Sequence, residues 1–433
     1  MIPALGDWRY TPEERLGGGG YAQAYRCHRP TLAADPYAIK VFANPFYANT
    51  FASEVRALQT MAGCPGTPSL VDYGRNGEGK LCLVTTFAPG VRLDRHIRYH
   101  GPLSPQQTAE LLTQLLKVLA FAHSKGLLHK DVKASNILMA GNRFTLLDWG
   151  VAEALGNGRS ESIRAKQDYV APECYYGTHH CATDFYSLGW LAVEALAGAL
   201  PYHFQEIGDM DYRVAAHCLE RPELPPGIPD ALGRLNLNWL QKRAERRVIG
   251  YELSALQAEV QGYRADFCAE MDVRQIRHEC SFLHQAARHG VPYAQYRFAL
   301  RLLKLRRQPE ARYWLQAARE NGYLQATCQL GQLLGQGSEQ EKTRGHELLA
   351  EAAHAGHTLA QYLLGSSLLR AKGAARDVDQ AASLLRLAAG AGHGRSQYEL
   401  ARLLENELGK TDEAEHYYAM AADRGIHLRR HKI

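Results

Sequence analysis

The chain has 433 residues, of which 46% are hydrophobic and 22% are charged. This length exceeds what one hydrophobic core usually supports, so two or three domains are expected, and the composition excludes long disorder. The net charge of +5 is small for this length and gives no support to nucleic-acid or membrane binding. Nine cysteines without a C-x-x-C pair indicate reduced thiols rather than a disulfide scaffold.

The first 100 residues mix short β-like segments with glycine and proline, and the sequence becomes helical from about Ser104. The segment "LGGGGYAQAY" is a glycine-rich turn of the kind that lets backbone N–H groups approach phosphates, although alone it could be a flexible surface loop. "YAIKVF" then places Lys40 in a strand, where a lysine either protects a sheet edge or anchors a phosphate. "FASEVRALQTM" has a helical pattern and carries Glu54, the only acid in this part of the chain. Glu54 is therefore the local candidate to pair with Lys40, and otherwise an ordinary solvated helix residue.

A long apolar helical pattern leads into "LHKDVKASNILM", in which Asp131, Lys133 and Asn136 stand at fixed spacing. "FTLLDWG" follows and places Asp148 at the end of an apolar strand. Carboxylate and amide oxygens are the ligands that Mg²⁺ prefers.

Two further segments complete the order of motifs. "YVAPE" ends at Glu173, and "TDFYSLGWLAVEAL" predicts a second apolar helix with Asp184 as its N-cap. With these parts in this order, residues from about 8 to 260 resemble a eukaryotic-type (Hanks-type) Ser/Thr protein kinase domain. The resemblance implies an α+β two-lobed kinase-like domain over residues 8–262, with an N-lobe of about 8–88 and a C-lobe of about 89–262.

The resemblance also implies a role for each motif residue. Lys40 would hold the α- and β-phosphates of ATP, and Glu54 would hold Lys40. Asp131 would accept the proton of the substrate hydroxyl or orient it, while Lys133 would steady the γ-phosphate. Asn136 and Asp148 would bind Mg²⁺. The complete set of residues implied to contact ATP is Leu16, Gly17, Gly18, Gly19, Gly20, Lys40, Thr85, Phe87, Asn136 and Asp148. Glu173 would pair with a late arginine, for which Arg247 is the best candidate and Arg246 nearly as good.

Several positions depart from the family pattern. Ala22 replaces the third loop glycine, and Trp149 replaces the phenylalanine of D-F-G as an equally large apolar residue. Lys130 stands for the arginine that grips an activation-segment phosphate in many members, and lysine offers only a point charge. We therefore expect a kinase that does not wait for such a phosphate, although Ser160 and Ser162 are possible sites. Lys166, where a threonine is usual, could restrain Asp131 or recognise an acidic substrate.

The last third of the chain is self-similar. Segments such as "EAAHAGHTLAQYLLGSSLL" align around shared glycines at Gly290, Gly322, Gly356, Gly392 and Gly425, and small residues follow four positions later at Ala294, Ala326, Ala360 and Ser396. A period in the low thirties predicts helix–turn–helix units that stack into an all-α solenoid. The signature resembles Sel1-like (tetratricopeptide-related) repeats over 281–433, preceded by a helical linker at 263–280. Within that family the repeats are interaction scaffolds.

Together these patterns predict an ATP- and Mg²⁺-dependent Ser/Thr protein kinase whose repeats dock a protein substrate or partner. The alternative is a pseudokinase scaffold that binds nucleotide and partners without phosphotransfer, but the residues that degenerate kinases commonly lose are all present. Neither a membrane-spanning run nor a secretion signal occurs in the sequence, so a cytoplasmic protein is expected. The sequence leaves open the oligomeric state, the substrate, and whether the repeats bind substrate or act on the kinase lobes.

Overall fold

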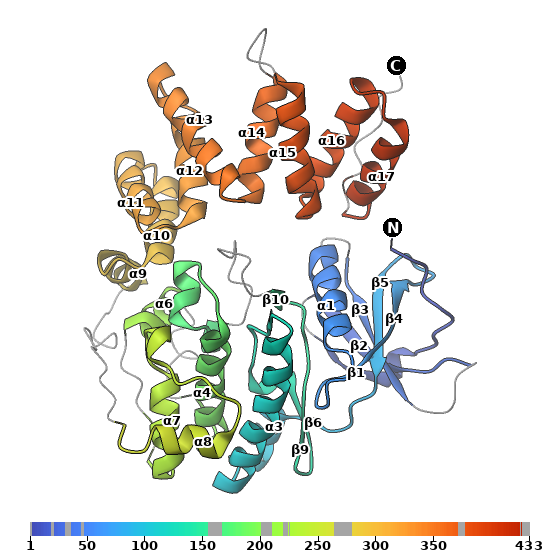
Figure 1. Ribbon diagram of the computed structural model, residues 1–433, viewed down its shortest axis with the longest axis vertical. Helices are drawn as coiled ribbons and strands as arrows, with labels where there is room; N and C mark the ends of the chain where they lie inside the picture. Colours follow the sequence, from blue (N-terminus) through green and yellow to red (C-terminus); the bar gives the residue numbers. More distant parts are fainter. Residues whose placement is uncertain are drawn as a thin grey trace.

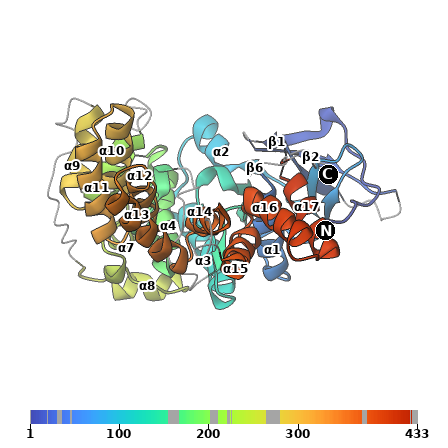
Figure 2. The ribbon, with the colours of Figure 1, turned by 90° about the horizontal axis from the view of Figure 1, so that it is seen from above.

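The computed structural model describes residues 2–18, 21–30, 36–44, 47–154, 167–200, 210–219, 224, 226–263, 279–370, 377–424 and 426. Figures 1 and 2 show a β-rich N-terminal lobe, a mainly helical C-terminal lobe and a helical region that extends over both. The sequence predictions on Gly19, Gly20, Ser160, Ser162 and Lys166 lie outside the described residues, as do residues 264–278 of the expected linker and Gly425.

The N-terminal lobe is built on a five-stranded antiparallel sheet with the order β1-β2-β3-β5-β4, and α1 packs on it. Side chains alternate between the two faces of β3, so Ile39 and Val41 face one apolar cluster while Lys40 and Phe42 point to the side of α1. This alternation is what brings Lys40 toward Glu54. The elements are a 3₁₀ turn η1 (Pro12–Glu14), β1 (Arg15–Gly18), β2 (Ala22–Cys27), β3 (Tyr37–Phe42), α1 (Ala48–Thr60), β4 (Leu70–Arg75) and β5 (Leu81–Thr86).

The C-terminal lobe contains short strands as well as helices. Of these strands the sequence predicted the one before Asp148, which is β9, and not the others. Two small sheets, with the orders β6-β8-β9 and β10-β7, hold the segments between the helices. The elements are β6 (Val91–Arg92), α2 (Leu93–His100), α3 (Pro105–Ser124), β7 (Leu127–Leu128), η3 (Ala134–Asn136), β8 (Ile137–Ala140), β9 (Arg143–Leu146), β10 (Glu153–Ala154), η4 (Gln167–Tyr169), η5 (Pro172–Tyr176), α4 (Cys181–Ala197), α6 (Met210–Leu219), α7 (Asp230–Trp239), η6 (Ala244–Arg246) and α8 (Leu253–Glu259).

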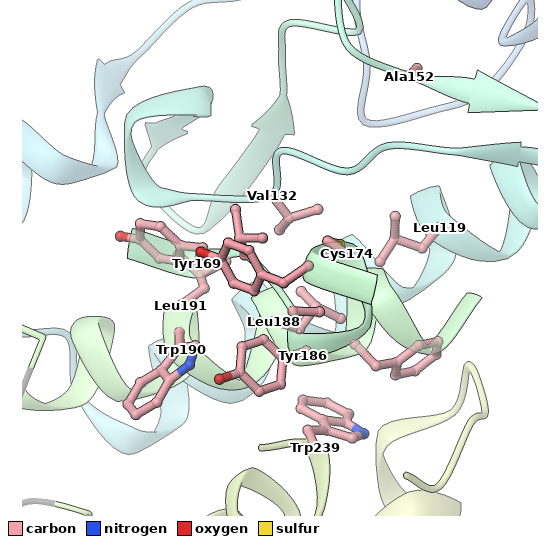
Figure 3. Packing of buried hydrophobic residues seen from close by; sticks show 14 of the residues in the cluster. Leu119, Val132, Ala152, Tyr169, Cys174, Tyr186, Leu188, Trp190, Leu191 and Trp239 are labelled. Atoms are coloured by element: carbon pink, nitrogen blue, oxygen red, sulfur yellow. The ribbon is translucent and has the colours of Figure 1, made fainter. Parts of the chain in front are cut away.

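Helices α3 and α4 form the centre of this lobe. A capping box opens α3, because Ser104 Oγ accepts a hydrogen bond from the Gln107 N–H and Gln107 Oε1 accepts one from the Ser104 N–H, each at 3.1 Å. Leucines at helical spacing along α3 are fully buried, and so are Tyr186 and Trp190 of α4. Figure 3 shows these aromatic rings packed with Trp239 and Val132 beneath the loop that follows β7. The predicted apolar helix at Asp184 is confirmed but starts earlier, since His180 is the N-cap of α4 and Asp184 lies in its first turn.

From Glu279 onward the described chain is helical, and each helix packs against the next one along the chain. The elements are α9 (Glu279–Arg288), α10 (Pro292–Lys304), α11 (Gln308–Glu320), α12 (Leu324–Leu334), α13 (Glu339–His354), α14 (Thr358–Arg370), α15 (Val378–Gly390), α16 (Gly394–Asn406) and α17 (Thr411–Ala422).

The motif that recurs in the sequence has the same local structure each time. The shared glycines Gly290, Gly322, Gly356 and Gly392 all have φ between 79° and 88°, a left-handed conformation that ends one helix and starts the next. The small residues that follow, Ala294, Ala326, Ala360 and Ser396, are fully buried, as close helix contact requires.

A buried glutamine repeats one hydrogen bond in three of these units. The side chains of Gln295, Gln361 and Gln397 donate to the carbonyl oxygens of Ala287, Ala353 and Ala389 at 3.1, 3.2 and 3.1 Å. In each case the acceptor lies near the end of the preceding helix, where carbonyl groups lack an intrahelical partner.

Candidate active site

A cavity of about 510 Å³ lies between the two lobes. Its walls come from β1, β2, β3 and α1 above, from the segment after β5 at one side, and from the loops around η3 and β9 below. The sequence-predicted residues that line it are Leu16, Gly17, Gly18, Lys40, Glu54, Thr85, Phe87, Lys133, Asn136 and Asp148. Residues that lie more than a hundred positions apart in the sequence thus share one cavity.

Lys40 is held between two carboxylates at the back of the cavity. Its Nζ atom lies 2.8 Å from both carboxylate oxygens of Glu54 and 3.0 Å from Oδ1 of Asp148. The side chain of Glu54 is only 5% exposed, and burial raises its pKa to about 7 although Lys40 acts to lower it. Burial also opposes ionisation of Asp148, but Lys40 and Tyr21 hold the pKa of that carboxyl below its usual range. Glu54 is therefore the partner of Lys40 and not a solvated helix residue.

The loop after β7 brings Asp131, Lys133 and Asn136 together. Lys133 Nζ lies 2.5 Å from Asp131 Oδ2, and the Asn136 amide donates to the carbonyl and to Oδ2 of Asp131, both at 2.9 Å. The 3₁₀ turn η3 carries Asn136 back toward Asp131, so the five-residue spacing becomes a direct contact. Lys133 and Asn136 thus fix the orientation of the Asp131 side chain.

Asp184 of α4 fixes the backbone of this loop. Its carboxylate accepts hydrogen bonds from the N–H groups of His129 at 3.0 Å and Lys130 at 2.8 Å, and it also bonds His123 at 2.9 Å. Lys130 has φ of 66°, a conformation that costs a non-glycine residue free energy and that these bonds hold. Asp184 thus braces the loop, and its predicted role as N-cap is wrong because His180 is the N-cap and the Asp184 oxygens accept hydrogen bonds from the loop.

The segment around Asp148 is anchored from below. Trp149 is fully buried, its indole N–H donates to Thr67 Oγ1 at 2.8 Å, and its ring stacks edge-on against His129 at 4.5 Å. Thr67 in turn donates to the Leu146 carbonyl at 2.9 Å. Trp149 shares a buried apolar cluster with residues of α1. Thr67 accepts the hydrogen bond of the indole N–H group, and the sequence analysis did not single out this threonine.

The donor atoms around the cavity fit a nucleotide phosphate chain with Mg²⁺. An ionised Asp148 and the amide oxygen of Asn136 are hard oxygen donors, and Lys40 and Lys133 supply positive charge. Within the described ranges no group of three or more His, Cys, Asp or Glu side chains could hold a metal by itself. This pattern suits Mg²⁺, which is commonly held by one or two protein ligands together with substrate phosphates.

Tyr21 is a site residue that sequence reasoning missed. Its hydroxyl donates to Asp148 Oδ2 at 2.5 Å, and its ring lies 5.1 Å from Lys40 Nζ. The signal was available, since an aromatic residue directly follows the four glycines of the loop. Tyr21 occupies the space beside both charged groups.

Two ion pairs secure the neighbouring segments. Glu173 accepts two hydrogen bonds from Arg247, at 2.7 and 2.8 Å, in a fully buried pair, so the choice of Arg247 over Arg246 is confirmed. Lys130 contacts the carboxylate of Glu153 on β10. Glu153 is a second residue that the sequence did not single out. It reaches Lys130 because β10 pairs with β7, and this pairing is not evident from the sequence.

Residues 10–248 match the family model described as the protein kinase domain. The chain belongs to the protein kinase family. The match covers more than half of the 433 residues and includes both lobes around the cavity. It ends before α8, which packs on α3 and α7, so the domain end near residue 262 stays a prediction.

Similar kinases occur in bacteria and animals. The serine/threonine-protein kinase PknA of Mycobacterium tuberculosis is 31% identical over 248 residues, which is 53% of this chain and 56% of PknA. The serine/threonine-protein kinase ULK3 of Xenopus laevis is 29% identical over 266 residues, or 58% of this chain and 55% of ULK3. The chain thus spans about half the length of the curated relatives it matches. The solved granulovirus kinase PK-1 of Cydia pomonella covers 57% of this chain and 91% of its own, but its TM-score of 0.49 and 17% identity are too low to add to the family match.

Proposed function

We propose that this chain transfers the γ-phosphate of ATP, with Mg²⁺, to serine or threonine hydroxyls of protein substrates. The observation that carries the proposal is the contact of Lys40 with both Glu54 and Asp148 in one cavity with the Asp131 loop. Phosphoryl transfer depends mainly on positioning and on neutralising charge, and these residues supply both.

The residues divide the work as follows. Lys40, fixed by Glu54, binds the α- and β-phosphates, and Lys133 binds the γ-phosphate beside Asp131. Asp131 orients the substrate hydroxyl and takes its proton as the hydroxyl oxygen bonds to the γ-phosphorus, while the bond from that phosphorus to the bridging oxygen breaks and ADP leaves. Asp148 and Asn136 would hold Mg²⁺, which would neutralise charge on the phosphates. The segment with Thr85 and Phe87, with Leu16 opposite, encloses the base of the nucleotide.

Serine and threonine are the favoured acceptors for two reasons. Lys133 stands two residues after Asp131, the Ser/Thr form of this loop, and the curated relatives described above are serine/threonine kinases by name. The Glu173–Arg247 pair and the α4 brace belong to elements that small-molecule kinases of related fold generally lack. A protein substrate follows from that comparison.

For the C-terminal helices we propose an array of Sel1-like repeats that forms a solenoid and docks a protein substrate or partner. The repeated glycine turns and glutamine hydrogen bonds support this assignment. The pseudokinase alternative gains no support from the geometry. The predicted phosphate and metal residues in the described ranges line the cavity, and the predicted base Asp131 contacts two of the lining residues, Lys133 and Asn136. In the described residues no helix is both long and apolar enough to cross a membrane; the cytoplasmic location stays a prediction.

Labelled nucleotide tests the proposal. The full chain is incubated with Mg²⁺, a generic protein acceptor and ATP carrying label at either the γ- or the α-phosphate. We expect transfer from the γ position only, at serine and threonine, and a loss of at least about a hundredfold in Asp131→Ala and Asp148→Ala. Transfer from the α position would instead indicate nucleotidyl transfer. Absence of transfer by the wild-type chain, despite nucleotide binding, would support the scaffold.

A further inference from the structure

The helical region contacts the two kinase lobes at opposite ends. Near its start, α9 packs on α6 of the C-terminal lobe, and the ring of Tyr293 lies 5.5 Å from that of Tyr175. Tyr175 is fully buried and Tyr293 is 8% exposed, and residues of α9 through α13 belong to the same apolar cluster as the C-terminal lobe. Burial of these apolar side chains stabilises the contact between the start of the helical region and the C-terminal lobe.

The contact at the other end is small and polar. Arg75, the last residue of β4, donates through Nη2 to Asp423 Oδ1 at 2.5 Å, just after α17 ends. The two side chains are 24% and 33% exposed. Figures 1 and 2 both place α16 and α17 beside the N-terminal lobe, far along the chain from the α9 end. A partly solvated ion pair of this kind is readily broken and is weakened by salt.

A turn of the array also touches α1, the helix that carries Glu54. A Cβ atom on Gly392 would come 2.3 Å from Oδ1 of Asn49, in the first turn of α1. The equivalent turn glycines Gly290 and Gly356 have open space at the same position. Gly392 thus differs from Gly290 and Gly356 in that a side chain of the N-terminal lobe lies against it. Its φ of 87° favours glycine at this turn.

We propose that the helical array is a second, non-covalent connection between the lobes, latched to the N-terminal lobe by Arg75, Asn49, Gly392 and Asp423. We call these four residues the N-lobe latch. The latch stabilises the position of α1 in which Glu54 reaches Lys40, because Asn49 and Glu54 lie on the same helix. The array then acts on the kinase itself as well as on partners, and a protein that occupies the α16–α17 surface competes with the latch and lowers activity.

This inference rests on the proposed phosphotransfer only for its effect on rate. The latch is tested by hydrogen exchange, which needs no catalysis. The variants are Asp423→Arg, Arg75→Asp and the double exchange Arg75→Asp/Asp423→Arg, all in the full chain. Because Arg75 Nη1 also donates to the Gly79 carbonyl, Asp423→Arg is the cleaner single change. Arg344→Asp on α13, where Arg344 forms an exposed pair with Glu347, is the matched control.

We expect Asp423→Arg to raise amide exchange in residues 48–60 about fivefold and to lower kcat by a similar factor, with little change in the KM of the protein acceptor. The double exchange should bring both values back to within about twofold of the wild type. The control should change neither.

Unchanged exchange in α1 for both single variants, or no recovery in the double exchange, would overturn the latch. If the wild-type chain transfers no phosphate, but the variants show the expected changes in amide exchange, the proposed function is refuted and the latch is supported. Raised exchange without a fall in kcat would show a contact that has no effect on Glu54, and would refute the activating role.

Discussion

Tyr21 donates a hydrogen bond to one of the two oxygens of Asp148, the carboxylate proposed to bind Mg²⁺. Desolvation raises the pKa of the tyrosine far above neutrality, so the group that fills this position is an uncharged donor. Mg²⁺ bound at Asp148 would compete with the Tyr21 hydroxyl for this carboxylate. At the residue scale, we therefore expect nucleotide binding to displace the Tyr21 hydroxyl.

The variant Tyr21→Phe tests this competition. Removing the hydroxyl frees Asp148 in the nucleotide-free enzyme, so we expect ATP with Mg²⁺ to bind about threefold to tenfold more tightly. Calorimetric titration of nucleotide into the full chain measures the affinity. Tyr25→Phe on β2, which removes a hydroxyl outside the cavity, is the control and should keep the wild-type affinity. Unchanged or weaker binding by Tyr21→Phe would show that its hydroxyl imposes no cost.

Lys130 pairs with the carboxylate of Glu153, a negative charge that the chain supplies without phosphorylation. We expect Glu153→Gln to lower kcat about threefold to tenfold, because Lys130 directly precedes Asp131 and loses its anchor on β10. Treatment of the wild type with a phosphatase should leave kcat unchanged. Steady-state kinetics on both preparations gives the answer, with Glu78→Gln, from an exposed pair with Lys80, as a neutral control. A large loss after phosphatase treatment would contradict a phosphate-independent kinase.

The motif residues were predictable one by one because each chemistry requires its residue type. Lys40, Glu54, Asp131, Lys133, Asn136 and Asp148 could all be named from spacing and order. Tyr21, Thr67 and Glu153 could not, since their roles depend on partners brought close by the fold. A tyrosine next to a run of glycines does not indicate a site residue in the sequence, because its role depends on the contact with Asp148 in the fold.

At the element scale, α3 and α4 are joined by the pair of His123 and Asp184, which also fixes the loop of Asp131. Burial by itself would lower the pKa of His123, but hydrogen bonds to Asp184 and Cys181 and the charge of Asp184 raise it to about 9. The folded protein thus holds a proton that the unfolded chain releases near pH 6.5. The resulting stability is fully present below that pH and is lost as pH rises through about 9.

This linkage predicts a loss of unfolding free energy of at most about 3 kcal/mol between pH 6 and pH 9 from this histidine. Urea unfolding at the two pH values, followed by a probe in the C-terminal lobe, measures it. His123→Gln should be less stable at pH 6 and show a smaller loss toward pH 9. His96→Gln on α2 serves as the control and should keep the wild-type slope. Equal slopes for His123→Gln and the wild type would exclude the linkage.

Element boundaries followed local signals where these were strong. The strand at 37–42 and the capped start of α3 agree with the sequence pattern. The strand before Asp148 was predicted and is β9. The short strands β6, β7, β8 and β10 and the start of α4 at Cys181 were not predicted, because strands of two to four residues form only when a partner strand is in place. Asp184 was expected to be a helix cap because of its position before an apolar helical pattern. The sequence did not show that the loop of His129 and Lys130 donates hydrogen bonds to its oxygens.

On the scale of the whole molecule, the helices after Glu279 repeat one unit, and in a solenoid each unit depends on its neighbours. Loss of the Gln361 bond should therefore be felt locally. We expect Gln361→Leu to raise amide exchange in α13 and α14, at a cost of ~1–2 kcal/mol, and to leave α3 and α4 of the kinase lobe unaffected. Gln316→Leu on α11, whose side chain bonds the exposed Glu320, is the control. Exchange that rises across the whole chain would argue against a stack of units.

Residue type and spacing along the chain were enough to predict the kinase family pattern, the order of the proposed catalytic residues and the period of the repeats. The position of the array could be found only from the folded chain. The contacts of Arg75 with Asp423 and of Asn49 with Gly392 join residues more than 340 positions apart, and neither side alone shows a pattern. Such contacts are set by the packing of every intervening helix, so they become visible only when the chain is folded.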